Sequence, residues 1–378
     1  MSIKIIFICG CLESGRDGVG DYSRKLAGEL IRQGHNCYMI SLMDKFLLIE
    51  KEEKQFDNEI SIDTLRLPFV LGLKRNSITA RKWAITKNAD WVSFQYVPFS
   101  FNKRGLPISL AKQVAKITEC MKLHLMIHEP FMGISKISPL KHKIIGYFQK
   151  AILKSIVKRL PQIYTTTTNK LYQLILHDIG IKADILCLFS NINKHPFDFN
   201  MYSTKLNEIE QFGNNKSKFR IICIFGTLYP NSNIETELQN QLIYTSKLDK
   251  ELVFISFGRI GMSGLIEYEL IKKKFDKKIK FFHIGDVSER EASHIAQLSD
   301  VAFSCTPSQH IGKSGVYAFL KLHNIPVILT TSQILPEYDR LMRKWYDDFE
   351  KRESLLWDVK YIANLYVKKL QQINIQYD

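Results

Sequence analysis

Short apolar runs alternate with amphipathic helical patterns along most of this chain of 378 residues. The runs are rich in β-branched and aromatic residues and have the length of strands. The first half contains six, at 3–9, 36–42, 91–95, 123–128, 163–168 and 184–189, and the second half five, at 219–226, 251–258, 278–285, 301–307 and 325–331. Strands that alternate with helices are typical of parallel sheets with helices on both faces. The pattern therefore predicts the α/β class, with two doubly wound, Rossmann-like domains.

A polar stretch at 196–218 interrupts this alternation and predicts a linker between the domains. We therefore place an N-terminal domain at 1–195 and a C-terminal domain at 219–344. Residues 345–378 have a helical pattern with a basic side, and we consider that they pack back on the first domain. Because ligands of doubly wound sheets bind beyond the carboxyl ends of the strands, we expect the ligands in a central cleft that both domains face.

The charge balance favours anionic partners. Lys and Arg total 53 against 38 Asp and Glu, which gives a formal net charge of +15. Phosphorylated small molecules and anionic membrane surfaces are partners of such chains, although a lysine-rich solvated surface is the alternative. No basic-aromatic platform or helix-turn-helix pattern is present, so we do not expect nucleic acid as a partner. The seven cysteines fall mostly in strand-like runs, as buried thiols of a cytoplasmic protein do.

A second charged feature is the segment 138–162, which has the pattern of a basic amphipathic helix. Its predicted apolar stripe consists of Ile144, Ile145, Phe148, Ile152, Leu153, Ile156 and Val157, and lysines flank this stripe. Such a helix can lie on an anionic membrane, which would place the protein at the inner face of the membrane. The alternative is an ordinary helix that faces the core on one side and solvent on the other.

A glycine-containing loop follows the first predicted strand. Gly18 and Gly20 match two positions of a dinucleotide fingerprint, but Ser23 stands at the third. About eleven residues separate Cys9 from the helix start, and a tight dinucleotide turn has no room for them. Asp44 stands where a ribose-binding acid would, so a nicotinamide-dependent enzyme remains an alternative. A longer loop instead brings backbone N–H groups to phosphate or sugar oxygens, unless the glycines merely permit a turn.

The stretch "GVGDYSRKLAGELIRQGH" resembles the N-terminal loop and helix of GT-B fold glycosyltransferases of the family-four type. The resemblance covers most of the chain in the right order. It continues through "DWVSFQYVPFSFNKRG", "MIHEPF" and "TTTTNKLYQLI", and then through "IFGTLYP", "ISFGRIG", "FFHIGDVSEREASHIAQLSDVAFSCTP" and "KSGVYAFLKLHNIPVIL".

The resemblance implies transfer of a sugar from a nucleotide donor held by the C-terminal domain to an acceptor held by the N-terminal one. A departing diphosphate needs fixed positive groups or N–H dipoles. Lys313, with Ser314 and Gly315 at the start of a helix, is the expected diphosphate cradle, and Arg259 is an expected second clamp. The alternative is that both cations are ordinary surface residues. The other expected donor contacts are Gly18, Gly20, Gly226, Thr227, Gly285 and Val287.

His128 matches the histidine that lies beside the donor sugar in that family, and it is the expected catalytic residue. A core histidine with satisfied hydrogen bonds is the alternative. We expect Asp21, Gln95, Tyr96 and Glu129 on the acceptor side.

The chain departs from the family pattern at several positions. Members of the family carry two glutamates where this sequence has Ile311 and Phe319, and "TLYPNSN" lacks the usual lysine. These losses leave open a non-catalytic sugar- or nucleotide-binding relative. The only near match to a metal-binding D-x-D pair is "DFN" at 198–200, inside the predicted linker, so we expect no metal and no other cofactor.

These observations lead to one functional expectation. We expect a metal-independent glycosyltransferase that acts with retention, a chemistry implied by the resemblance. The acceptor would be a glycan or a lipid-linked molecule in the synthesis of cell-surface polysaccharide or glycolipid.

Overall fold

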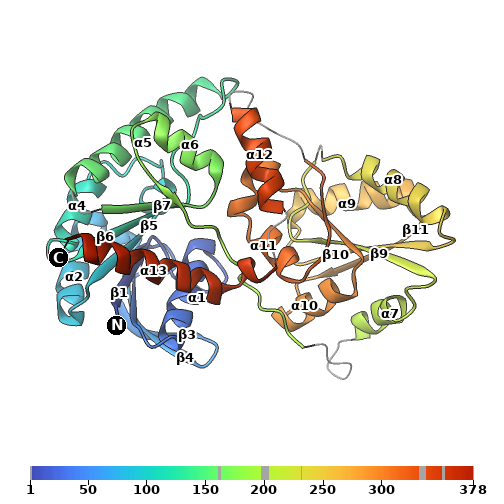
Figure 1. Cartoon of the computed structure of the whole chain (residues 1–378), viewed down its shortest axis with the longest axis horizontal. Helices are drawn as coiled ribbons and strands as arrows, with labels where there is room; N and C mark the ends of the chain where they lie inside the picture. Colours follow the sequence, from blue (N-terminus) through green and yellow to red (C-terminus); the bar gives the residue numbers. More distant parts are fainter. Residues whose placement is uncertain are drawn as a thin grey trace. The chain divides into compact units, whose positions relative to one another are not determined.

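The computed structural model describes residues 2–160, 163–196, 204–230, 232–331, 338–350 and 354–377. The chain divides into two compact units (Figure 1). Unit 1 consists of Met1–Cys187 together with Ile362–Asp378, and unit 2 consists of Leu188–Tyr361. The described part of the interval expected as a linker includes helix α7 (Thr204–Gly213), and residues 197–203 lie outside the described residues.

Unit 1 is built on a sheet whose eight strands, within the described residues, follow the order β3-β4-β2-β1-β5-β6-β7-β8. All neighbouring strands are parallel except β3 and β4. The strands are β1 (Lys4–Cys9), β2 (Asn36–Asp44), β3 (Lys51–Asp57), β4 (Ile60–Pro68), β5 (Trp91–Tyr96), β6 (Lys122–Ile127), β7 (Ile163–Thr167) and β8 (Asp184–Ile185). The predicted strands at 3–9, 36–42, 91–95, 123–128 and 163–168 are confirmed, whereas the run at 184–189 pairs only over its first two residues.

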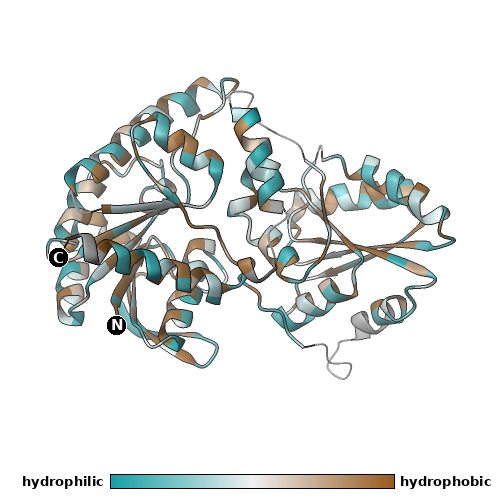
Figure 2. Ribbon diagram, in the orientation of Figure 1, coloured by the Kyte–Doolittle hydropathy of each residue, from teal (hydrophilic) through white to brown (hydrophobic). Residues whose placement is uncertain are grey.

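Helices cover this sheet because each has one apolar side. In α1 (Gly18–Arg32), Leu26, Ala27 and Leu30 are buried against the sheet. The other helical segments are η1 (Phe69–Leu71), α2 (Leu73–Lys87), α3 (Pro98–Phe101), α4 (Leu110–Ile117), α5 (Leu140–Arg159) and α6 (Lys170–Asp178). Figure 2 shows the hydrophobic residues concentrated in the strands and on the helix sides that face them. Burial of this apolar surface is the main force that holds the unit together.

The C-terminal helix α13 (Val359–Tyr377) completes unit 1. Its Tyr366 is buried, and the ring centroid lies 4.9 Å from that of His124 and 6.3 Å from that of Phe7. The helix therefore covers strands β1 and β6 on one face of the sheet.

Unit 2 contains a parallel sheet with the strand order β11-β10-β9-β12-β13 among its described residues. The strands are β9 (Phe219–Phe225), β10 (Glu251–Phe257), β11 (Ile279–Gly285), β12 (Val301–Ser304) and β13 (Val327–Leu329), and all five predicted runs are confirmed as strands. Besides α7, the helical segments are α8 (Ile234–Ser246), α9 (Gly261–Phe275), α10 (Glu289–Leu298), η2 (Ser308–Lys313), α11 (Gly315–Leu322), α12 (Asp339–Glu350) and η4 (Ser354–Trp357).

The order of the second sheet creates a topological switch point. From β9 the chain builds outward to β10 and β11, and then returns to add β12 and β13 on the other side. The connections therefore diverge at the carboxyl ends of β9 and β12, which leaves a crevice there. In unit 1 the corresponding divergence lies between β1 and β5.

Within the described residues, no helix is both long enough and apolar enough to cross a membrane.

Candidate functional site

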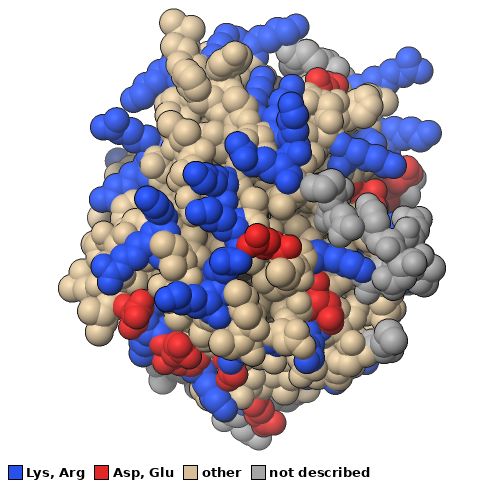
Figure 3. Space-filling model, turned by 90° about the vertical axis from the view of Figure 1, so that its left-hand side faces the viewer, with Lys and Arg blue, Asp and Glu red and all other residues tan. Residues whose placement is uncertain are grey.

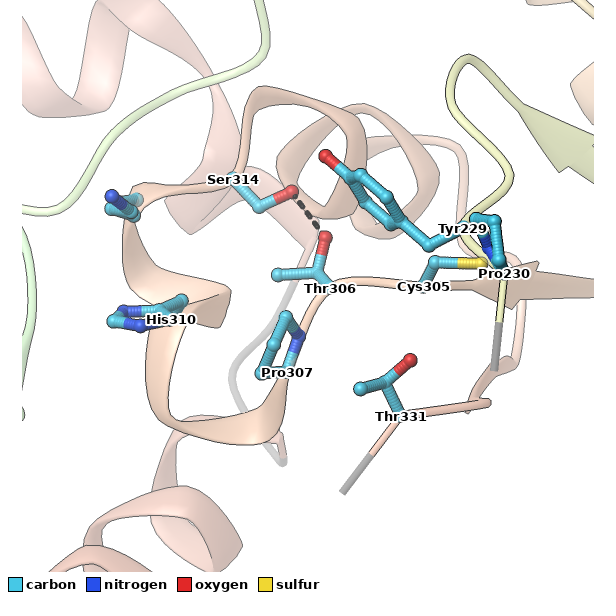
Figure 4. Close-up of a pocket in the computed structure, with 9 residues that line it drawn as sticks. Tyr229, Pro230, Cys305, Thr306, Pro307, His310, Ser314 and Thr331 are labelled. Carbon is cyan, nitrogen blue, oxygen red and sulfur yellow. Dashed lines mark hydrogen bonds between the residues drawn. The ribbon is translucent and has the colours of Figure 1, made fainter. Parts of the chain in front are cut away.

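A pocket of about 570 Å³ lies at the switch point of unit 2. It is bounded by the segments that follow β9 and β12, by Thr331 after β13, and by η2 together with the start of α11 (Figure 4). The lining residues are Tyr229, Pro230, Cys305, Thr306, Pro307, His310, Lys313, Ser314 and Thr331. Its place is the one that the doubly wound topology predicts for a ligand.

The amino-terminal end of α11 is open toward a ligand. Ser314 caps the helix, since its Oγ accepts a hydrogen bond from the N–H of Tyr317 at 3.1 Å. The hydroxyls of Ser314 and Thr306 lie 3.0 Å apart and point toward one another in Figure 4. Gly315 is the first helical residue, and a Cβ added there would meet nothing within 4 Å. The helix dipole and the first N–H groups make such an end suitable for an anion.

Lys313 and His310 add chemistry to the same pocket. Burial, with a smaller contribution from the charge of Lys313, lowers the pKa of His310 to about 4. The imidazole is therefore neutral at pH 7, and Lys313 supplies the positive charge in the lining. The Oγ1 atom of Thr331 is buried without a hydrogen-bond partner among the described residues. A polar ligand could supply that partner, because buried hydroxyls are generally hydrogen-bonded.

The remaining predicted donor residues of unit 2 surround the carboxyl edge of its sheet. Gly226 follows β9 and Gly285 ends β11, and both have φ of +78°, which favours glycine. Thr227 is exposed, while Val287 packs against the apolar core below α10. Arg259, after β10, is exposed, and its Nε lies 3.7 Å from a carboxylate oxygen of Asp286.

The two positions at which the resemblance implies glutamates are filled by the core. Ile311 is fully buried, and Phe319 is buried with its ring 4.9 Å from that of Phe225. An acid at either position would lose its hydration without a charged partner in this packing. The pocket therefore presents Lys313 and hydroxyls in a setting from which the family's carboxylates are absent.

In unit 1, His128 follows β6 directly and is buried. Its Nε2 lies 2.8 Å from Oε1 of Gln95 on β5, and the ring of Tyr22 meets its own ring edge-on at 5.1 Å. The resemblance implied that Gln95 contacts the acceptor. Because Gln95 is 1% exposed and hydrogen-bonded to His128, it orients this histidine instead.

The contact continues inward as a chain of hydrogen bonds. Nε2 of Gln95 lies 2.8 Å from Oγ of Ser93, which lies 2.8 Å from Nδ1 of His124. Nε2 of His124 then lies 2.8 Å from Oγ1 of Thr166. Burial lowers the pKa of His124 to about 3, so this ring is neutral and has one donor and one acceptor nitrogen. Donors and acceptors therefore match at each step of these hydrogen bonds, which cross strands β5, β6 and β7.

Two further residues expected on the acceptor side differ in exposure. Tyr96 is fully buried in the apolar core of unit 1, where it cannot contact an acceptor. Glu129 is exposed next to His128.

The glycine loop after β1 is fixed by its own side chains. Asp17 caps α1 by accepting hydrogen bonds from the N–H groups of Val19 and Gly20, and burial raises the pKa of this carboxyl. A Cβ at Gly20 would lie 2.5 Å from the carbonyl oxygen of Cys11, whereas one at Gly18 would meet nothing. Gly20 is therefore needed for close packing, and a carboxylate already occupies the position where a phosphate would bind.

Asp21 also supports the loop from within. Its carboxylate accepts hydrogen bonds from the backbone N–H of Gly15 and from Arg24, and Arg24 donates to the carbonyl of Leu12 at 2.7 Å. Asp21, which was expected on the acceptor side, therefore organises the turn before α1.

Asp44 is not placed to bind a ribose. It is fully buried, and its carboxylate lies 2.9 Å from Nε of Arg66, which also contacts Glu13 and Glu53. Burial opposes its ionisation, but hydrogen bonds from Arg66 and from backbone N–H groups outweigh this effect and lower the pKa of Asp44. The acid of the nicotinamide alternative is thus committed to a structural ion pair.

Sequence reasoning named Lys313 and Ser314 but missed the other lining residues of the pocket. Tyr229 and His310 lie just beyond predicted strands, and Thr306 lies near the carboxyl end of one; that position was the available signal. Among the described residues, no group of three or more His, Cys, Asp or Glu side chains is arranged to hold a metal ion.

Similarity to known proteins is found in structure rather than in sequence. No protein-family model matches the chain, and no curated protein matches it by sequence. The catalytic domain of starch synthase IV from Arabidopsis thaliana, bound to ADP and acarbose, superposes over 100% of this chain and 99% of its own, with a TM-score of 0.55 and 10% identity. The chain has the GT-B fold.

Two other proteins of this fold extend the comparison. HepE from Anabaena, in complex with UDP and glucose, is 15% identical and covers 99% of both chains with a TM-score of 0.50. UDP-GlcNAc 2-epimerase from Methanocaldococcus jannaschii is 14% identical and covers 98% of this chain and 100% of its own, with a TM-score of 0.51. Since the fold serves both sugar transfer and epimerisation, the activity must be argued from the site.

Proposed function

We propose that this chain is a glycosyltransferase that takes a sugar from a nucleoside diphosphate sugar. The observation that carries the proposal is the pocket at the switch point of unit 2, in which Lys313 and the open start of α11 lie together. The catalytic domain of starch synthase IV and HepE have the same fold, and their structures contain the nucleoside diphosphates ADP and UDP. A nucleoside diphosphate is the ligand that this charge and this helix end suit best.

The proposed chemistry follows from the charge that develops on the donor. As the bond between the sugar and the diphosphate breaks, negative charge grows on the departing phosphate oxygen. Lys313 and the first N–H groups of α11 would stabilise that charge. The acceptor hydroxyl would attack from the same face and pass its proton to the departing phosphate, which gives retention. His128, held by Gln95, would hydrogen-bond the sugar, an assignment that rests on the resemblance.

The proposed acceptor is a glycan or a lipid-linked molecule in the synthesis of cell-surface polysaccharide or glycolipid. Such an enzyme would work in the cytoplasm at the inner face of a membrane. The support for this part is the net charge of +15.

One alternative has a specific observation in its favour. Because Ile311 and Phe319 are core residues, the pocket lacks both carboxylates that the family uses. A relative that binds the nucleotide sugar without turning it over would tolerate this loss. The nicotinamide-dependent alternative is disfavoured, since Asp44 is buried against Arg66.

Thermal unfolding in the presence of ligands tests the proposal. Nucleoside diphosphates, their sugars, NAD and NADP would be screened for a rise in Tm, since a ligand of the folded state stabilises it by mass action. We expect stabilisation by one nucleoside diphosphate. Binding should be about 10- to 100-fold weaker in Lys313→Ala, because this variant removes the ammonium group of Lys313 from the pocket lining. Lys272→Ala, at an exposed position of α9, is the matched control.

Turnover then separates the proposal from its alternative. Release of free nucleoside diphosphate from the stabilising donor supports a transferase. Stabilisation without release, with and without glycan or lipid-linked acceptors, would indicate the binding protein. Stabilisation by NAD or NADP alone would refute both.

A further inference from the structure

The positive charge of the chain is concentrated in one segment of unit 1. Of the 53 Lys and Arg residues, 30 lie in unit 1 with 17 of the 38 Asp and Glu residues, so 13 of the 15 net positive charges belong to this unit. Residues 103–159 alone hold twelve Lys or Arg and two Asp or Glu, a net charge of +10. Lys and Arg side chains are spread widely over the face of unit 1 in Figure 3, where Asp and Glu are fewer. A net charge of +10 within residues 103–159 favours contact with an anionic surface.

Helix α5 has its two sides in different environments. One side, with Gln149, Ile152 and Ile156, is buried against unit 1. The opposite side is apolar as well in its first turns: Leu140 is 73% exposed and Ile144 and Phe148 are each 51% exposed. The predicted apolar stripe is therefore divided, because Ile152, Leu153 and Ile156 belong to the core, as the alternative of a core-facing helix expected.

More large hydrophobic residues continue this exposed side. Tyr147 is exposed, with its ring centroid 5.6 Å from that of Phe148, and Ile137 projects just before the helix at 93% exposure. Exposed lysines surround them, namely Lys136, Lys141, Lys143 and Lys154. We call the set Ile137, Leu140, Ile144, Tyr147 and Phe148, with these four lysines, the α5 surface.

We propose that the α5 surface docks unit 1 on an anionic lipid bilayer. Apolar side chains that project from one side of a basic helix can enter the boundary between headgroups and acyl chains, while aromatic residues favour that boundary. Lysine stems lie along the apolar layer and carry their ammonium groups to the lipid phosphates. Exposed apolar side chains set among lysines complement a bilayer, whose anionic headgroups lie above an apolar layer. Docking itself is argued from the α5 surface alone. Its purpose, access to a lipid-linked acceptor, rests on the proposed function.

Vesicle co-sedimentation of the full chain tests this proposal without any donor. We expect binding to vesicles of phosphatidylcholine with phosphatidylglycerol and at least about tenfold weaker binding to phosphatidylcholine alone. The variant Leu140→Ser/Ile144→Ser/Phe148→Ser should bind the anionic vesicles at least about tenfold more weakly. Its matched control is Ile243→Ser/Ile266→Ser/Leu270→Ser, three positions of unit 2 that are 58–59% exposed.

A second pair of variants separates charge from apolar contact. Lys136→Gln/Lys141→Gln should weaken binding to the anionic vesicles about tenfold or more, and Lys272→Gln/Lys273→Gln on α9 should not. Unchanged Tm values and unchanged stabilisation by the nucleotide would show that the fold and the donor pocket remain intact, so docking and donor binding can fail separately. The proposal is overturned if the wild-type chain ignores anionic vesicles, if both triple variants bind equally, or if heparin is bound and vesicles are not.

Discussion

His128 donates a hydrogen bond from Nε2 to Oε1 of Gln95 over 2.8 Å. The direction follows from the next hydrogen bond: the amide nitrogen of Gln95 donates to Oγ of Ser93, so the amide oxygen faces His128 and can only accept. The proton of His128 is therefore fixed on Nε2, and Nδ1 is left as the acceptor. The buried side chain of Gln95 thus decides which ring nitrogen of His128 can accept a hydrogen bond.

This relationship predicts the behaviour of Gln95→Leu. The variant should lose the single tautomer of His128, which nitrogen chemical shifts in an NMR spectrum would report directly. It should also lower the free energy of unfolding by about 1–3 kcal/mol, because His128 and Ser93 each lose a partner. Gln173→Leu removes a hydrogen bond to the Ala183 carbonyl elsewhere in unit 1 and is the control. An unchanged His128 spectrum in Gln95→Leu would show that Gln95 does not set the tautomer.

The glycine loop predicts a contrast between two neighbouring substitutions. Gly20→Ala places a methyl group 2.5 Å from the backbone oxygen of Cys11 and should destabilise unit 1 by about 1–3 kcal/mol through overpacking. Gly18→Ala meets open space and should be neutral or slightly stabilising. Urea titrations of the two variants measure the difference. Equal stabilities would mean that the loop moves away from α1 at little cost.

Arg66 predicts a large stability loss with a matched surface control. Arg66→Met leaves the fully buried carboxylate of Asp44 without its charged partner, which should cost about 3–5 kcal/mol of unfolding free energy. Arg32→Met breaks the more exposed pairs with Glu29 and Asp57 and should cost less than about 1 kcal/mol. Denaturant titration at pH 7 compares the two. Losses of similar size would contradict the distinction between the buried and the surface pair.

Neutral buried histidines predict sensitivity to mild acid. Burial lowers the pKa of His124 to about 3 and those of His294, His310 and His323 to about 4. The unfolded chain takes up protons near pH 6.5 and the folded chain does not, so stability present above pH 6.5 is lost as the pH falls toward 4. Each histidine contributes a slope of at most about 1.4 kcal/mol per pH unit.

The variant His124→Gln isolates one of these contributions. The free energy of unfolding should fall less steeply between pH 6.5 and 4, by about 1.4 kcal/mol per pH unit, than in the wild type. The comparison uses slopes, so any loss of stability at pH 7 does not affect it. A slope equal to that of the wild type would show that His124 is protonated in the folded state.

The strands and the two doubly wound units were predictable because buried parallel strands form continuous apolar runs that alternate with helical patterns. The hairpin of β3 and β4 was missed for the opposite reason. Strand β3 reads "KEEKQFD", and its charges alternate with half-buried positions at the edge of the sheet. Such an edge strand is stabilised by pairing with β4, which a hydrophobicity pattern does not reveal.

The site was predictable only where a helix start marked it. Lys313 and Ser314 were named because a helix pattern follows them directly, whereas Thr306 and His310 reach the same pocket through the path of the chain after β12. The role of Gln95 could not be predicted from the sequence, because its hydrogen bond to His128 joins residues 33 positions apart. The exposed apolar side of α5 could not be predicted either, because periodicity does not show which apolar side of a helix meets the core.

The whole of unit 2 lies in the chain between Cys187 and Ile362, which both belong to unit 1. A ribosome delivers residues in order, so unit 2 emerges complete while unit 1 still lacks the helix that carries Tyr366. Until that helix is synthesised, the side chains of Phe7 and His124 lack their contact with the ring of Tyr366. The domain that begins synthesis is therefore the last to be finished, and a nascent chain arrested after unit 2 would offer its uncovered sheet to chaperones.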